Sequence, residues 1–89
     1  MAAVVYLVND LLFTSKIRET AAQLGLDVQA VRAIGDVAQL TAGARFFVID
    51  LRRPDALSAL KDADPAAHKI GFIDHENLDV VEHHLAALV

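Results

Sequence analysis

Three short, uninterrupted apolar runs constrain the fold of this chain more than any other feature. They cover residues 4–8 (VVYLV), 46–49 (FFVI) and 70–73 (IGFI). All three are rich in β-branched and aromatic residues and lack the polar alternation of a half-solvated strand. Such runs are typical of strands buried on both faces, as in a parallel sheet covered by helices. Each run is followed by a polar residue: Asn9-Asp10, Asp50 or Asp74.

Helical patterns lie between these runs. Phe13, Ile17, Ala21 and Leu24 recur at helical spacing and predict one buried stripe, which ends before Gly25. Residues 27–33 have mixed polarity, and this indicates a weaker strand at an edge of the sheet.

Three more helices are predicted. Asp36 and Gln39 have the spacing of a capping box for a second helix that ends near Gly43. Pro54 suits the first turn of a third helix, and residues 78–89 predict a fourth.

The alternation of strands and helices predicts the class of fold. Strand and helix alternate four times, which favours a parallel sheet with right-handed crossovers and helices on both faces. The 89 residues allow one domain, so we expect residues 1–89 to form a single α/β three-layer sandwich with a mainly parallel four-stranded sheet.

Composition excludes several classes of function. A net charge of −4 without a basic cluster argues against binding to nucleic acid or to an anionic membrane. No apolar run reaches membrane-spanning length, and no basic region precedes the first one, so we expect a cytoplasmic protein without a signal peptide. The chain has no cysteine for disulfides or thiolate chemistry. A protein or small-molecule partner remains the expectation.

The polar strand ends are the candidate site. In open α/β sheets, ligands bind beyond the carboxyl ends of the strands, where Asp10 and Asp50 converge if their strands are neighbours. Two carboxylates could hold Mg²⁺ there, and one could accept a phosphoryl group. Asp and Asn at such turns also serve as helix N-caps, and spacing alone favours this structural interpretation. The neighbouring Arg52-Arg53 could form a rim for an acidic partner.

Residues 4–10 and 46–54 resemble the receiver domains of bacterial response regulators, a flavodoxin-like family. The resemblance covers essentially the whole chain and implies the strand order 2-1-3-4-5, of which this chain would lack the fifth strand. It implies that Asp50, with Pro54 four residues on, corresponds to the phosphoacceptor position. It also implies that Asp10 corresponds to a direct metal ligand, so a weakened Mg²⁺ site at Asp10 and Asp50 is the one cofactor expected.

Departures from the family pattern point to a degenerate site, as in pseudo-receivers. Asn9 reduces the acidic pair of the family, and Asp74 stands where the family has a Ser or Thr that contacts the phosphoryl group. The family lysine at the end of a fifth strand has no counterpart. We therefore expect a non-enzymatic signalling or protein-interaction module. One alternative is a working phosphoacceptor that uses Asp50 and Mg²⁺. Another is a small flavin or nucleotide binder, but the segment Leu11-Leu12-Phe13 stands where such a protein would have its phosphate-binding loop, and this disfavours it.

Loss of a fifth strand would leave the fourth strand at an edge. Its apolar sequence then favours self-association, with a possible homodimer interface at Ile70, Phe72, Leu85 and Leu88. In the alternative, the last helix covers that edge and the chain stays monomeric. His75, Asp79 and His83 share one stripe of that helix, but they span too far for one compact metal site and are interpreted as a solvated face.

Overall fold

The computed structural model describes residues 2–9 and 11–72, although not the side chain of Phe72. The order of elements in this part of the chain is β1 (Val4–Leu7), α1 (Leu11–Gln23), β2 (Val28–Ala30), the 3₁₀ turn η1 (Ile34–Asp36), α2 (Val37–Thr41), β3 (Phe46–Asp50), α3 (Ala56–Asp62) and β4 (His68–Phe72). Several predicted features lie outside the described residues. They are the last helix and the residues Asp10, Asp74, His75, Asp79, His83, Leu85 and Leu88.

The four strands form one sheet in the order β2-β1-β3-β4, and every pair is parallel. The register sets Val4 of β1 opposite Val28 of β2 and Phe46 of β3. On the far side of β3, Asp50 is opposite Phe72. The predicted fold class and strand order are therefore confirmed.

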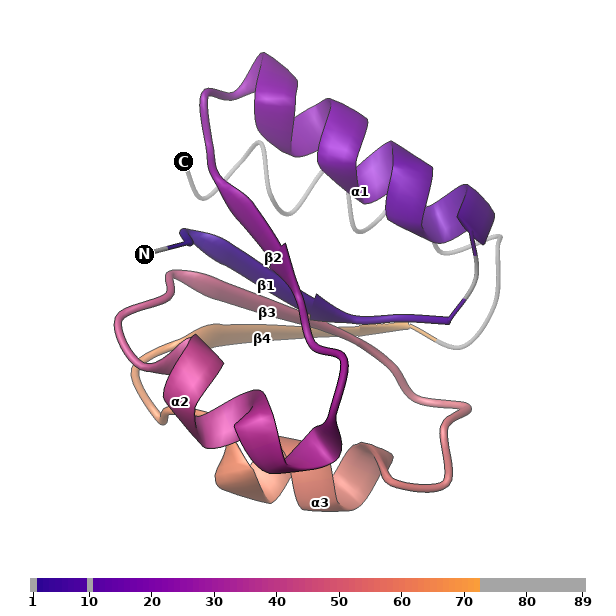
Figure 1. Cartoon of the computed structure of the whole chain (residues 1–89), viewed down its shortest axis with the longest axis vertical. Coiled ribbons are helices and arrows are strands. Elements are labelled where there is room, and N and C mark those ends of the chain that lie inside the picture. The colour runs from indigo at the N-terminus through magenta and orange to yellow at the C-terminus, as the bar shows by residue number, and fades with distance from the viewer. Residues whose placement is uncertain (1, 10, 73–89) are drawn as a thin grey trace.

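Helices cover both faces of this sheet, so the molecule has three layers. Figure 1 shows α1 on one face, with α2 and α3 together on the other. Successive residues of a strand point to opposite faces, and this alternation divides the core in two. The α1 side packs residues such as Val4, Tyr6, Phe46 and Val48. The opposite side packs their sequence neighbours Val5, Leu7, Phe47 and Ile49. Both strands β1 and β3 are buried along their whole length, which explains their uninterrupted apolar sequences.

The first helix follows its predicted stripe. Phe13, Ile17 and Ala21 are buried against the sheet, and Leu24, just beyond the end of α1, packs at the border of the same cluster. The chain leaves the helix through Gly25, whose φ of 72° lies in the left-handed region that favours glycine.

Two of the predicted helix starts are wrong in detail. Asp36 is the N-cap residue of α2, but its side chain makes no capping hydrogen bond, because the 3₁₀ turn η1 leads directly into the helix. Pro54 precedes the N-cap residue Asp55 of α3 and so stands just outside the first turn. The buried face of α3 consists of Ala56 and Ala59, whereas Leu57 is 74% exposed.

The two outer strands differ in length. The predicted weak strand over residues 27–33 is a three-residue strand, β2, and the predicted fourth strand begins two residues earlier than expected, at His68. In residues 2–9 and 11–72, no helix combines the length and the apolar character that crossing a membrane requires.

Candidate functional site

The site begins with Asp50, the last residue of β3. Its side chain is only 6% exposed, which is unusual for a carboxylate. Asp50 is not the helix cap that spacing favoured, because α3 starts six residues later and its N-cap residue is Asp55. Instead, the Asp50 Oδ1 atom accepts the backbone N–H of Arg52 at 2.9 Å, which closes the tight turn after the strand.

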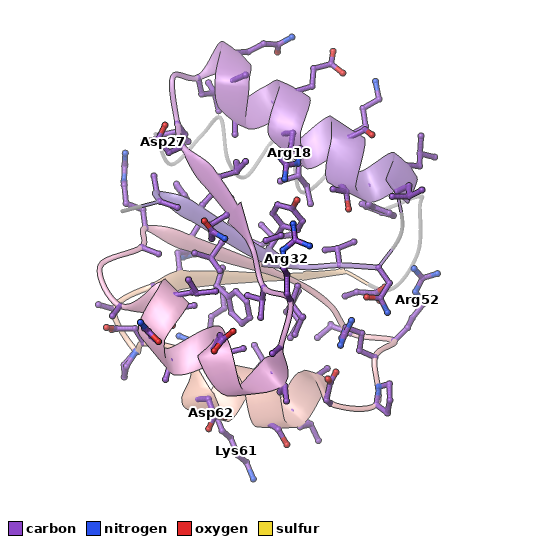
Figure 2. All side chains as sticks on the ribbon, in the orientation of Figure 1. Arg18, Asp27, Arg32, Arg52, Lys61 and Asp62 are labelled. Atoms are coloured by element: carbon purple, nitrogen blue, oxygen red, sulfur yellow. The ribbon has the colours of Figure 1, made fainter. Side chains whose placement is uncertain are left out.

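Arg52 also neutralises this carboxylate. Its Nε donates to Asp50 Oδ1 and its Nη2 donates to Asp50 Oδ2, both at 3.0 Å. This is the bidentate geometry that a guanidinium forms with a carboxylate. The Arg52 side chain is 43% exposed, so the ion pair lies at the surface with its acidic half buried. Figure 2 shows Arg52 at the side of the molecule where β1 and β3 end and α1 begins.

The next residue, Arg53, connects the turn to two other elements. Its Nε and Nη2 donate to the two carboxylate oxygens of Asp55, at 2.8 and 3.0 Å. Its Nη1 donates to the side-chain oxygen of Asn9, which follows β1 and is 44 positions away in sequence. Asp55 therefore pairs with an arginine and makes no side-chain capping bond to α3.

Electrostatics keep these groups charged. Burial alone raises the pKa of Asp50, but the hydrogen bonds and positive charge of Arg52, together with the charge of Arg53, outweigh it, and the pKa lies below its ordinary value. The hydrogen bond to Asp55 raises the pKa of Arg53, and the same bond lowers the pKa of Asp55. The cluster formed by Asn9, Asp50, Arg52, Arg53 and Asp55, here called the arginine clasp, thus balances two positive against two negative charges.

The arginine clasp brings together some of the predicted site residues. Asn9 and Asp50 both lie at the carboxyl edge, where Arg53 donates to Asn9 and Arg52 donates to Asp50. The convergence expected from the sequence was that of Asp10 with Asp50, and Asp10 lies outside the described residues. The sequence suggested that Arg52-Arg53 could form a rim for an acidic partner. In the structure, both side chains form ion pairs with carboxylates of their own chain. The signal for these pairs in the sequence was the spacing of opposite charges: Asp50 lies two residues before Arg52, and Asp55 lies two residues after Arg53.

A cation at Asp50 would compete with the positive charge of Arg52, because both carboxylate oxygens already accept hydrogen bonds from this guanidinium. Across residues 2–9 and 11–72, no three histidine or acidic side chains gather closely enough to hold a metal ion. Asp10, the expected partner of Asp50 in a Mg²⁺ site, is outside these residues, so that site stays a prediction.

A surface hollow elsewhere offers little chemistry. It is lined by Ala2, Gln29, Gln39, Leu40 and Ala42. None of these residues is titratable and none belongs to the arginine clasp. The carboxyl edge is therefore the stronger candidate for function.

The fold and its polar edge define a Rossmann-like parallel α/β protein, an architecture compatible with the flavodoxin-like class. Comparison with protein-family models and with curated protein sequences finds no match. Among solved structures, the chain is similar to a de novo designed protein of the Rossmann 2x3 fold, determined by solution NMR. The TM-score is 0.63 at 17% identity, over 98% of this chain and 91% of the designed one. This similarity concerns the fold alone.

Proposed function

We propose that this chain is a non-enzymatic, receiver-like protein-interaction module whose phosphorylation site is degenerate. Its expected setting is bacterial signalling in the cytoplasm, as the receiver resemblance implies. The observation that carries the proposal is the bidentate ion pair between Asp50 and Arg52. It occupies the carboxylate that a working receiver would present to Mg²⁺ and to a phosphoryl donor.

The ion pair opposes phosphorylation in two ways. An aspartate attacks a phosphorus atom through a free carboxylate oxygen, yet each Asp50 oxygen accepts a hydrogen bond from Arg52. Phosphoryl transfer also needs positive charge placed on the incoming oxygens. Here the charges of Arg52 and Arg53 are directed to Asp50 and Asp55, carboxylates of the chain itself.

The arginine clasp also supports a static role for this edge. Arg53 joins the end of β1, through Asn9, to the start of α3, through Asp55. A loop held by two ion pairs and by a hydrogen bond to Asn9 favours a constant surface, as an interaction module requires.

Intact mass measurement after incubation with acetyl phosphate and Mg²⁺ tests the proposal. The wild-type chain, Asp50→Asn and Arg52→Ala are compared under identical conditions. We expect no mass gain of one phosphoryl group in the wild type. A gain that disappears in Asp50→Asn would contradict the proposal and establish the alternative of a working phosphoacceptor.

Arg52→Ala serves as the informative variant in the same experiment. It removes both guanidinium hydrogen bonds from Asp50 and leaves only the backbone N–H bond to Oδ1. A mass gain in Arg52→Ala alone would identify Arg52 as the group that blocks the acceptor.

A further inference from the structure

We propose that the outer edge of β4 pairs with β4 of a second copy of this chain, antiparallel, about a two-fold axis at Ile70. The inference deepens the proposed function, since it rests on the chain being an interaction module and names one partner. Its evidence comes from a different surface, the outermost strand of the sheet (Figure 1), and not from the arginine clasp.

The direction of the backbone groups in β4 follows from its pairing with β3. The backbone N–H of His68 donates to the Arg45 carbonyl at 2.8 Å. In a parallel ladder, every second residue directs both its N–H and its C=O to the same neighbour. His68, Ile70 and Phe72 therefore face β3. The backbone groups of Lys69 and Gly71 face the outer edge, where no strand from residues 2–9 or 11–72 pairs with them.

These outward residues are symmetric about Ile70. A two-fold axis at Ile70 places Lys69 of each copy opposite Gly71 of the other copy. Residues opposite each other in a hydrogen-bonded antiparallel pair exchange both N–H···O bonds. The arrangement thus satisfies the outward N–H and C=O groups of Lys69 and Gly71 in both copies. It also keeps the two Lys69 ammonium groups from facing each other, so no like charges are opposed.

Among residues 2–9 and 11–72, this edge lacks the usual protection against pairing. A lysine on an edge strand commonly deters association, but the Nζ atom of Lys69 donates to the carbonyls of Asp64 and Ala67 at 3.2 and 3.1 Å. Its charge is therefore held against the preceding turn. Gly71 is exposed and has no side chain to obstruct an approaching strand.

The opposite edge of the sheet is protected by contrast. Strand β2 has only three residues, and the exposed, charged Asp27 and Arg32 flank it closely. The exposed Gln29 side chain donates to the Ala30 carbonyl at 3.3 Å and so competes for its ladder groups. A short, polar edge of this kind discourages pairing. Because the β2 edge is protected and, in the described part of the chain, the β4 edge is not, we assign self-association to β4.

A matched pair of substitutions at residue 71 tests the register. Gly71→Lys places a lysine opposite Lys69 of the other copy, twice per dimer, and Gly71→Asp places a carboxylate there instead. Both add a Cβ that meets the half-exposed Leu51 side chain, 2.8 Å from its Cδ1, so this clash is common to the two variants. Sedimentation equilibrium of the full chain over a concentration series gives the dimer dissociation constant for each.

We expect the wild type to dimerise and Gly71→Lys to weaken the dimer about tenfold, because like charges oppose each other at two positions. Gly71→Asp should dimerise at least ten times more tightly than Gly71→Lys. The double variant Lys69→Glu with Gly71→Lys should regain the affinity of Gly71→Asp, since opposite charges again face each other while the Cβ contact with Leu51 remains. Equal dissociation constants for Gly71→Lys and Gly71→Asp would overturn the proposed register, and a strictly monomeric wild type at the highest soluble concentration would overturn the dimer.

Amide hydrogen exchange of the wild type supplies a test that depends on no variant. The amides of Lys69 and Gly71 should gain protection as the concentration rises through the dissociation constant. Protection of these two amides at concentrations where the chain is monomeric would mean that the chain covers its own edge, and the proposal would fall. Neither measurement depends on phosphorylation, so failure of the dimer and failure of the proposed function are distinguishable.

Discussion

The carboxylate of Asp50 accepts three hydrogen bonds from a single residue, Arg52: one from its backbone N–H and two from its guanidinium. The two residues are neighbours in sequence, yet Asp50 is buried and Arg52 is half exposed. This relationship explains how the chain buries a charged carboxylate at the end of β3. It also leads to two predictions, one for stability and one for pH.

Removal of the Arg52 side chain should destabilise the protein. Arg52→Ala leaves the buried Asp50 carboxylate with one hydrogen bond in place of three. We expect the free energy of unfolding to fall by about 1–2 kcal/mol. This is less than the loss expected for a fully buried ion pair, because Arg52 reaches solvent. Arg52→Lys keeps the positive charge but not the bidentate geometry, so its stability should lie between those of the wild type and Arg52→Ala. Urea unfolding of the three proteins checks the order, which is refuted if Arg52→Ala is as stable as the wild type.

The stability contributed by Asp50 should disappear in acid. Its pKa in the folded protein is depressed below the value of about 3.8 in the unfolded chain. The unfolded state therefore binds more protons as the pH falls, and the contribution is complete above the unfolded pKa and lost as the pH falls through the folded pKa. Asp50→Asn should be less stable than the wild type at neutral pH.

Urea midpoints measured from neutral pH down to about pH 2 test this pH dependence. The gap between the wild type and Asp50→Asn should narrow as the pH falls below the unfolded pKa of Asp50. Asp55, whose pKa is also lowered by Arg53, titrates in both proteins and does not affect the comparison. A gap that stays constant over this range would show that Asp50 does not titrate with folding.

Two glycines should respond to alanine with opposite signs. A Cβ at Gly25 or at Gly35 meets no atom within 4 Å, but Gly25 has a φ of 72°, whereas Gly35 has no positive φ. Gly25→Ala should cost about 1 kcal/mol because the left-handed region is strained for alanine. Gly35→Ala should gain about 0.4–1 kcal/mol by restricting the unfolded chain. Thermal or urea unfolding measures both, and equal effects at the two positions would contradict the backbone explanation.

The hydroxyl group of Thr41 should hold the end of α2 against the turn before β4. Its Oγ1 donates to the Val37 carbonyl at 2.7 Å and accepts the Asp64 backbone N–H at 2.9 Å, and the residue is fully buried. Thr41→Val should cost about 1–2 kcal/mol, because the Asp64 N–H loses its acceptor.

Hydrogen exchange at the Asp64 amide gives a local measure of this contact. Protection should be lost in Thr41→Val and kept in Thr41→Ser, which retains both hydrogen bonds. Unchanged protection in Thr41→Val would show that the hydroxyl does not hold this turn.

Most of the fold could be predicted because it depends on local patterns. Uninterrupted apolar runs at residues 4–8 and 46–49 indicated strands buried on both faces, and β1 and β3 are buried throughout. The stripe from Phe13 to Ala21 indicated the packed face of α1. The strand order required the receiver resemblance, since the residues alone do not say which strands are neighbours. Details of the helix starts failed at Asp36, because a 3₁₀ turn replaced the expected cap.

The site was only half predictable. That Asn9 and Asp50 lie at the same edge of the sheet follows from the rule that parallel strands end at one edge, and a sequence indicates where strands end. The arginine clasp could not be predicted in the same way. Its bond between Arg53 and Asn9 joins residues 44 positions apart, and it depends on the angle at which the β3–α3 loop leaves the sheet.

The sequence by itself determined that residues 4–7 and 46–49 form buried strands, that Phe13, Ile17 and Ala21 enter the core, and that polar residues follow the strands at the carboxyl edge. These properties follow from hydrophobic periodicity, a local signal. Only the tertiary structure decided that Asp50 is paired with Arg52 and that Lys69 is turned back onto Asp64 and Ala67. Such pairings depend on distances and angles between side chains, which are set when the elements pack together.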